Sequence, residues 1–239
     1  MSLLADRPRR WACLQVMAAG IAIAVLSGCD AKSIDTNFAF TPETKTGLII
    51  GSASSSREYS RYAATVRFLY AKAGQQSSAR QQNTGFIQSL PVDPLTLKPG
   101  SSELTGTDGT LFAISLTPGN YILEGWNIDS GTDAVVRPPD PKPLTFQVHQ
   151  GKATYIGNLH MFVRIGQSPQ GVTVISGAQP VIIDKSERDI PLLLQRYRNI
   201  KREDIEVYII DDRPWGGLGP PERLEVKLGR QIGRSPELR

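Results

Sequence analysis

The order of apolar and polar residues predicts strands along most of the chain from residue 47 onward. In residues 65–70, valine, phenylalanine and tyrosine occupy every second position, and residues 144–148 repeat this alternation. A period of two is typical of a strand with one buried face. Further strands are expected at 48–51, 109–116, 121–126, 153–165, 172–174 and 181–183. Because glycine and proline turns separate them and no helical period precedes residue 185, residues 47–184 are predicted to form an antiparallel β-sandwich.

The connections between the predicted strands are of two kinds. Residues 117–120, Thr-Pro-Gly-Asn, favour a tight turn, because proline presets its first position and Gly119 or Asn120 supplies a positive φ. The longer stretches 74–88 and 127–143 are expected to be surface loops. Residues 52–56 form a serine-rich cluster, which we interpret as a loop or an edge bulge rather than a nucleophile site.

The pattern changes after Asp184. Residues 185–210 are predicted to contain a helix near 188–199 and a late strand at 205–209. Residues 211–239 are rich in proline, glycine and charge, so we expect an extended tail that folding does not require. Trp215 in this tail has two interpretations: it docks back on the domain, or it is an exposed contact for a partner.

The N-terminal residues have the order of a secretory signal peptide. Three arginines precede an apolar stretch at about 14–26, and small residues follow before a cysteine. This stretch is shorter than the ~20 residues that a membrane-spanning helix needs. The last four residues resemble the lipobox of bacterial lipoproteins: Leu26, Ser27, Gly28 and Cys29.

The resemblance to bacterial lipoproteins implies how the chain is processed and where it resides. Residues 1–28 would be removed as the signal peptide, and Cys29 would carry a diacylglycerol and an acylated amine. Two or more acyl chains anchor a protein stably, so the expected location is the bacterial cell membrane, facing the periplasm. Asp30 resembles a signal for retention in the inner membrane, but the choice between inner and outer membrane stays open. Residues 29–46 are expected to be a tether, unless Phe38 and Phe40 dock on the domain.

A second resemblance concerns the sandwich itself. The leucine, proline-glycine and tyrosine of residues 116–121 resemble a hairpin of prealbumin-like and carboxypeptidase-regulatory-like domains. Residues 146–157 resemble the next hairpin of uncharacterised bacterial lipoproteins with this fold. The resemblance covers residues 47–165 and implies a prealbumin-like interaction module without an activity of its own.

Composition narrows the chemistry of the expected mature chain. Removing 28 residues from 239 leaves 211, with 27 − 3 = 24 basic and 23 − 1 = 22 acidic residues. This near balance, without a run of lysine and arginine, argues against a nucleic-acid partner. Cys13 leaves with the signal and Cys29 is lipidated, so no disulfide is expected. The chain has two histidines, His149 in a turn and His160 on a strand, whereas a zinc site needs three or four ligands, so no metal is expected and only a histidine pair assisted by carboxylates stays open.

These observations lead to one functional interpretation and one alternative. We expect a lipid-anchored, non-catalytic binding or scaffolding module with an envelope protein as its partner, and no catalytic residue, metal or cofactor. The alternative is an envelope hydrolase acting on glycan or peptide. A cleft with converging polar groups and acids of perturbed pKa would favour the hydrolase, whereas a closed sandwich with an exposed apolar edge would favour binding.

Overall fold

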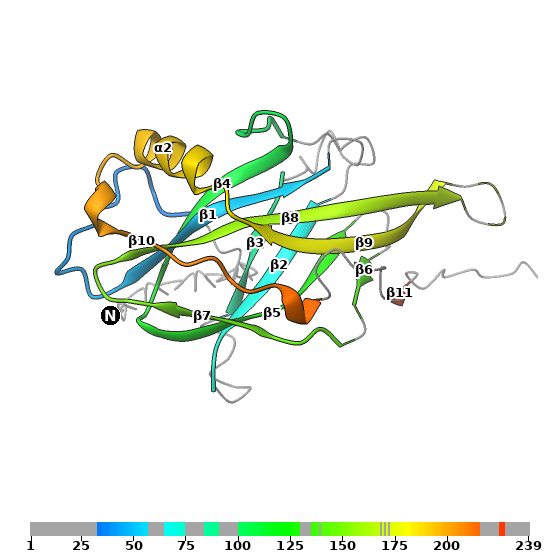
Figure 1. Cartoon of the computed structure of the whole chain (residues 1–239), viewed down its shortest axis with the longest axis horizontal. Coiled ribbons are helices and arrows are strands. Elements are labelled where there is room, and N and C mark those ends of the chain that lie inside the picture. The colour runs from blue at the N-terminus through cyan, green and yellow to red at the C-terminus, as the bar shows by residue number, and fades with distance from the viewer. Residues whose placement is uncertain are drawn as a thin grey trace, which may run out of the picture.

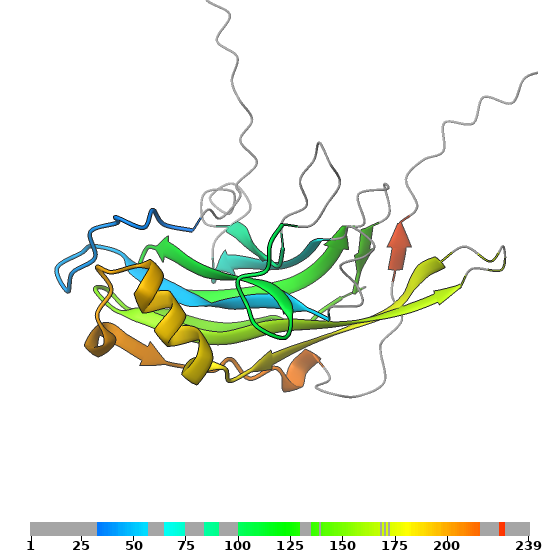
Figure 2. The ribbon, with the colours of Figure 1, turned by 90° about the horizontal axis from the view of Figure 1, so that it is seen from above.

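The computed structural model shows a mainly β protein in which two sheets pack face to face (Figures 1 and 2). It describes residues 33–56, 65–74, 84–90, 100–129, 135–138, 140–167, 169, 171, 173–215 and 225–227. Within these ranges, no helix has the length and apolar character required to cross a membrane. In this part of the chain, the two packed sheets form the sandwich architecture that the alternating pattern predicts.

The first sheet has the strand order β10-β8-β1-β4, and β9 also pairs with β8. Its strands are β1 (Gly47–Ser55), β4 (Asp108–Leu116), β8 (Ala153–Gln167), β9 (Thr173–Ile183) and β10 (Ile205–Val207). The β1–β4 and β8–β9 pairs are antiparallel, but β1 and β10 run parallel to β8. The expectation of a purely antiparallel sandwich is therefore wrong for two pairs. Parallel strands need a long crossover, and between β1 and β8 the chain forms β4 and most strands of the second sheet.

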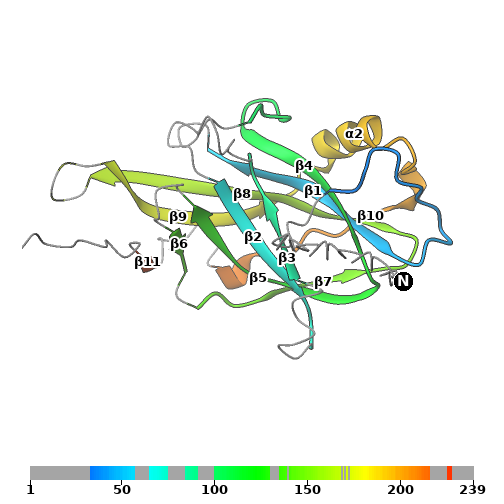
Figure 3. The ribbon, with the colours of Figure 1, turned by 180° about the vertical axis from the view of Figure 1, so that it is seen from behind.

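The second sheet has the order β11-β6-β5-β2-β3, with β7 also on β5 (Figure 3). Its strands are β2 (Thr65–Lys72), β3 (Thr84–Gln88), β5 (Gly119–Asp129), β6 (Val135–Arg137), β7 (Leu144–Val148) and β11 (Glu225–Lys227). All these pairs are antiparallel. The stretches 74–88 and 127–143, expected to be loops, contain β3 and β6. In β3 the apolar residues Phe86 and Ile87 are adjacent, so they do not alternate with polar ones, and β6 has only three residues.

The main core fills the space between the two sheets. The alternating side chains of β2 that the sequence predicted to face inward, Val66, Phe68 and Tyr70, are buried there. They meet β5 side chains such as Leu123 and Trp126. Gly119 has a φ of +141°, which confirms the positive φ expected for the turn before β5.

A second apolar cluster lies on the outer face of the first sheet, beneath helix α2 (Ser186–Arg196). Leu48 and Ile50 of β1 point toward Ile190 and Leu193 of the helix, while Ile49 between them faces the main core. A strand that is buried on both faces has a continuous apolar run, which explains the sequence at 48–50. The helix starts two residues earlier and ends three residues earlier than the predicted range of 188–199.

The N-terminal segment packs against the sandwich from residue 33 onward, so the tether expected at 29–46 is wrong for its described part. Phe40 is only 4% exposed and joins the cluster beneath α2. The N–H of Ile34 donates to the carbonyl oxygen of Ala113 at 2.7 Å. Of the two alternatives left open by the sequence, docking of the phenylalanines is the one observed.

The C-terminal segment also takes part in the sandwich, which corrects the loosely packed tail expected at 211–239. Trp215, in the short helix η3 (Arg213–Trp215), lies against Phe68 with ring centroids 6.4 Å apart. Farther along, β11 pairs with β6. The average composition of residues 211–239 gives no sign of these two contacts of its described residues, and the expectation that folding does not need the segment stays a prediction.

Two glycines with left-handed backbones test the docking of the N-terminal segment. Gly74 (φ +75°) borders open space, whereas a Cβ at Gly151 (φ +65°) would overlap the carbonyl group of Pro42. Gly74→Ala should cost about 1–2 kcal/mol through backbone strain alone. Gly151→Ala should cost about 1–3 kcal/mol more, because it also forces residues 33–46 off the turn. Urea unfolding of both variants measures the difference, and equal losses would contradict the docked arrangement.

Candidate functional site

Of the site residues predicted from the sequence, only Trp215 lies within the described part of the chain. Leu26, Ser27, Gly28 and Cys29 lie outside the described residues, so their role stays a prediction. Trp215 is half-buried on its own domain, and its Nε1 donates to the carbonyl oxygen of Lys142 at 2.7 Å. Of its two interpretations, docking back on the sandwich is the observed one. The polar side chains that the structure does gather are in two other places.

The first place is a buried polar cluster under the beginning of α2. Strand β1 contributes two serines that continue the face of Leu48 and Ile50 beyond the apolar part. Strand β8 contributes a tyrosine, an asparagine and a histidine, and α2 contributes an arginine and an aspartate. The members of this polar cluster are Ser52, Ser54, Tyr155, Asn158, His160, Arg188 and Asp189.

Asp189 is the centre of the cluster and is completely buried. Its Oδ2 accepts hydrogen bonds from the hydroxyls of Ser52 at 2.6 Å and Tyr155 at 2.8 Å, and its Oδ1 accepts one from Arg188 at 2.7 Å. Burial and the neighbouring Asp189 raise the pKa of Tyr155 well above its usual value, so the phenol keeps its proton and acts as the donor. These bonds join α2 to both β1 and β8.

The other end of the cluster contains a serine–histidine contact. Ser54 Oγ lies 2.8 Å from His160 Nδ1, and the amide of Asn158 donates to Ser54 at 3.0 Å. Burial, together with the positive charges of Arg188 and Lys185, lowers the pKa of His160 to about 4. The ring is therefore neutral near pH 7 and can share a single proton with Ser54.

The distance between Ser54 and His160 is that of a nucleophile and its general base, but a substrate has no access to the serine. Ser52 and Ser54 have no exposed surface, and an attacking hydroxyl has to reach its substrate. The arrangement is that of a saturated hydrogen-bond network that fixes the helix on the sheet. Sequence reasoning missed it because serines after an apolar run were interpreted as a loop. The available signal was that Ser52 and Ser54 keep the period of Leu48 and Ile50.

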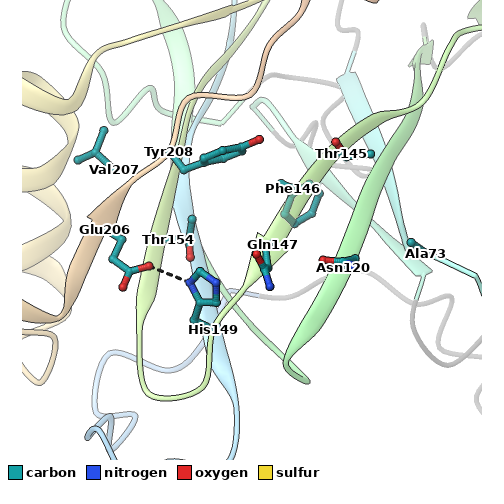
Figure 4. Close-up of a pocket in the computed structure, with 10 residues that line it drawn as sticks. All are labelled: Ala73, Asn120, Thr145, Phe146, Gln147, His149, Thr154, Glu206, Val207 and Tyr208. Carbon is teal, nitrogen blue, oxygen red and sulfur yellow. Dashed lines mark hydrogen bonds and ion pairs between the residues drawn. The ribbon is translucent and has the colours of Figure 1, made fainter.

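The second place is an open groove at one edge of the sandwich, between β10 of the first sheet and β7 of the second (Figure 4). Its volume is about 590 Å³. We call it the edge groove, and it is lined by Ala73, Asn120, Thr145, Phe146, Gln147, His149, Thr154, Glu206, Val207 and Tyr208.

Three features give the edge groove its chemistry. His149 Nδ1 and Glu206 Oε2 are 2.9 Å apart and form an exposed pair at one end (Figure 4). Tyr208 is 47% exposed, and its ring lies over the gap between the strands. Thr154 is only 2% exposed, yet its hydroxyl has no hydrogen-bond partner among the described residues. A buried hydroxyl without a partner is unfavourable, typically by about 1–3 kcal/mol.

The comparisons with known proteins do not assign a function to the polar cluster or to the edge groove. No protein-family model, curated protein or solved structure matches the chain. Within the described ranges, no group of three or more histidine, cysteine, aspartate or glutamate side chains is positioned to hold a metal ion. The polar cluster and the edge groove therefore have to be interpreted from their own geometry.

The polar cluster makes a prediction about stability. Asp189→Asn removes a buried acceptor charge that three donors share, so the free energy of unfolding should fall by about 3 kcal/mol. Glu187→Gln is the matched control, because it removes the other acidic charge of the first turn from an exposed position. The control should change stability by no more than about 0.5 kcal/mol. Chemical unfolding of both variants provides the values, and a similar small effect in the two would show that the cluster does not hold α2.

Proposed function

We propose that the protein is a lipid-anchored envelope lipoprotein whose β-sandwich binds or scaffolds a partner facing the periplasm and has no catalytic role. The anchor rests on the lipobox-like residues that end at Cys29. The binding role rests on the edge groove, where a concave surface meets an exposed aromatic ring and a buried hydroxyl without a partner. Concave sites with a few converging polar groups are the usual places of ligand binding.

The edge groove is the single observation that carries the binding role. The side chains of His149, Glu206 and Tyr208 are exposed to a space that a partner can enter, whereas the polar groups of the cluster face one another. The alternative of an envelope hydrolase finds support in one contact, the pair of Ser54 and His160. Since Ser54 is enclosed, binding at the groove is the function that the geometry supports better.

A pair of cysteine variants tests the anchor. Cys29→Ala should abolish labelling of the protein by an alkyne fatty acid in cells and leave the signal peptide uncleaved, which immunoblotting shows as a larger species. Cys13→Ala is the control, because this residue would leave with the signal peptide, and it should label like the wild type. Equal labelling of the protein with and without Cys29 would contradict the lipoprotein assignment.

Site-specific crosslinking in intact cells tests the binding role. A photoreactive phenylalanine analogue at position 208 should give discrete adducts that disappear in the Cys29→Ala variant. The same analogue at position 198, an exposed residue after α2, is the control and should give none. If the two positions give the same adducts, or position 208 gives none, the groove is not the binding surface.

A further inference from the structure

We propose that the edge groove binds an extended, non-acidic peptide segment of a partner protein, which adds as a strand to the outer edge of β10. This inference rests on the proposed binding function and names the chemistry of the ligand. It combines four observations: a free strand edge, the groove beside it, a hydroxyl without a partner and the charge of the lining residues.

The backbone of β10 has one edge available for a further strand. Tyr208 donates its N–H to the carbonyl oxygen of Tyr155 at 2.9 Å, so this side of the segment is paired with β8. Since successive peptide groups of a strand point to opposite sides, the N–H and C=O of Val207 point away from β8. In the described part of the chain, β10 has no other strand partner. An added peptide would find hydrogen-bonding groups there, as in other cases of strand addition.

β10 has no lysine, proline or bulge at its outer edge; the protection it has is its length of three residues and the charge of Glu206. Natural edge strands are commonly blocked by lysine, proline or a bulge. Ile205, Glu206 and Val207 form a regular parallel ladder with β8, and the next residue is the exposed Tyr208. The opposite wall of the groove, β7, pairs only with β5 among the described strands. The open space of the groove therefore lies between two sheet edges (Figure 4).

Thr154 supplies an independent indication that a ligand is part of the site. Its hydroxyl is nearly completely buried, lies at the groove and has no partner in the described structure. Thr154 is in register with Glu206 across the β8–β10 ladder, so it lies one strand inward from the free edge of β10. A polar group of a bound peptide would satisfy the hydroxyl. Such an unpaired group also favours polar over purely apolar ligands.

The charges of the lining residues determine which charge a bound peptide can carry. Glu206 is the one carboxylate among the residues that line the groove, and no lysine or arginine lines it. An acidic peptide would therefore meet the like charge of Glu206, whose partner in the groove is the His149 ring at 2.9 Å, whereas a basic residue near Glu206 is favoured. Tyr208 offers an amphipathic surface for an apolar side chain of the peptide. The expected ligand alternates apolar and polar residues and carries a lysine or arginine at one end.

Titration of the full chain, purified in detergent micelles, tests the proposal. The probe is a capped hexapeptide of alternating threonine and valine with an N-terminal lysine, and calorimetry measures its Kd. Its two matched controls are the same peptide with N-methylated alternate amides and a version with glutamate in place of lysine. The probe should bind, and both controls should bind at least about tenfold more weakly, because the first cannot form the ladder and the second repels Glu206.

Two variants connect that binding to the groove. Thr154→Val should raise the Kd of the probe about fivefold, as expected for the loss of one hydrogen bond. The thermal midpoint of the variant should stay equal or rise. Val207→Pro removes the N–H that points outward and should raise the Kd of the probe at least about tenfold. Val207→Thr keeps this N–H and should bind the probe like the wild type. A fall in the midpoint for Thr154→Val, or equal binding by the proline and threonine variants, would overturn strand addition at this edge.

The outcomes separate this proposal from the general binding role. If position 208 crosslinks in cells but the purified chain binds both control peptides as well as the probe, the peptide proposal is wrong and the binding role stands. Chitotetraose is a competing probe of another class. If it binds and the hexapeptide does not, the groove takes glycan and the peptide proposal is likewise overturned.

Discussion

The long strand β8 is paired along both of its edges, and most of the described structure depends on that pairing. One edge runs parallel to β1, while the other pairs first with β10 and then with β9. Gly157 lies where the ladder with β1 shifts its register, and its φ is +111°. A Cβ at this position would come within 2.7 Å of the Ile182 side chain, so the irregularity needs glycine.

The register shift at Gly157 determines which side chains β8 presents to each face. Before the shift, Tyr155 faces α2 and Ile156 faces the main core. After the shift, Asn158 and His160 join Tyr155 on the side of the helix and complete the polar cluster. One strand thus supplies both the buried network that fixes α2 and, through Thr154, the base of the edge groove. Stability and the proposed binding site share the same strand.

The sequence predicted the elements with a clear period and missed those without one. Residues 144–148 form a strand with the predicted bounds, because apolar and polar residues alternate along its whole length. Two short strands expected at 172–174 and 181–183 are one strand, β9, whose interior contains Gly177 and Pro180. Both residues are unfavourable inside a strand, and pairing with β8 outweighs their local preference.

The candidate sites were harder to predict, because they depend on contacts between distant residues. A regular period of two along β8 would place His160 on the same side as Thr154. The shift at Gly157 places the two side chains on opposite faces instead. The edge groove forms where β10 meets β8, about fifty residues apart in the chain, and no local pattern encodes that parallel pairing. Parallel pairs with a long crossover leave no turn signal in the sequence.

Amide hydrogen exchange at Val207 and Tyr208 in the purified full chain tests the central claim, a free strand edge beside the groove, most directly. The N–H of Tyr208 is bonded to Tyr155 and should exchange slowly, whereas the N–H of Val207 points outward and should exchange like an exposed amide. Saturation with the bound peptide should then slow exchange at Val207 and leave Tyr208 unchanged. Equal protection of the two amides in the free protein would contradict the account, because it would show that the edge is already occupied.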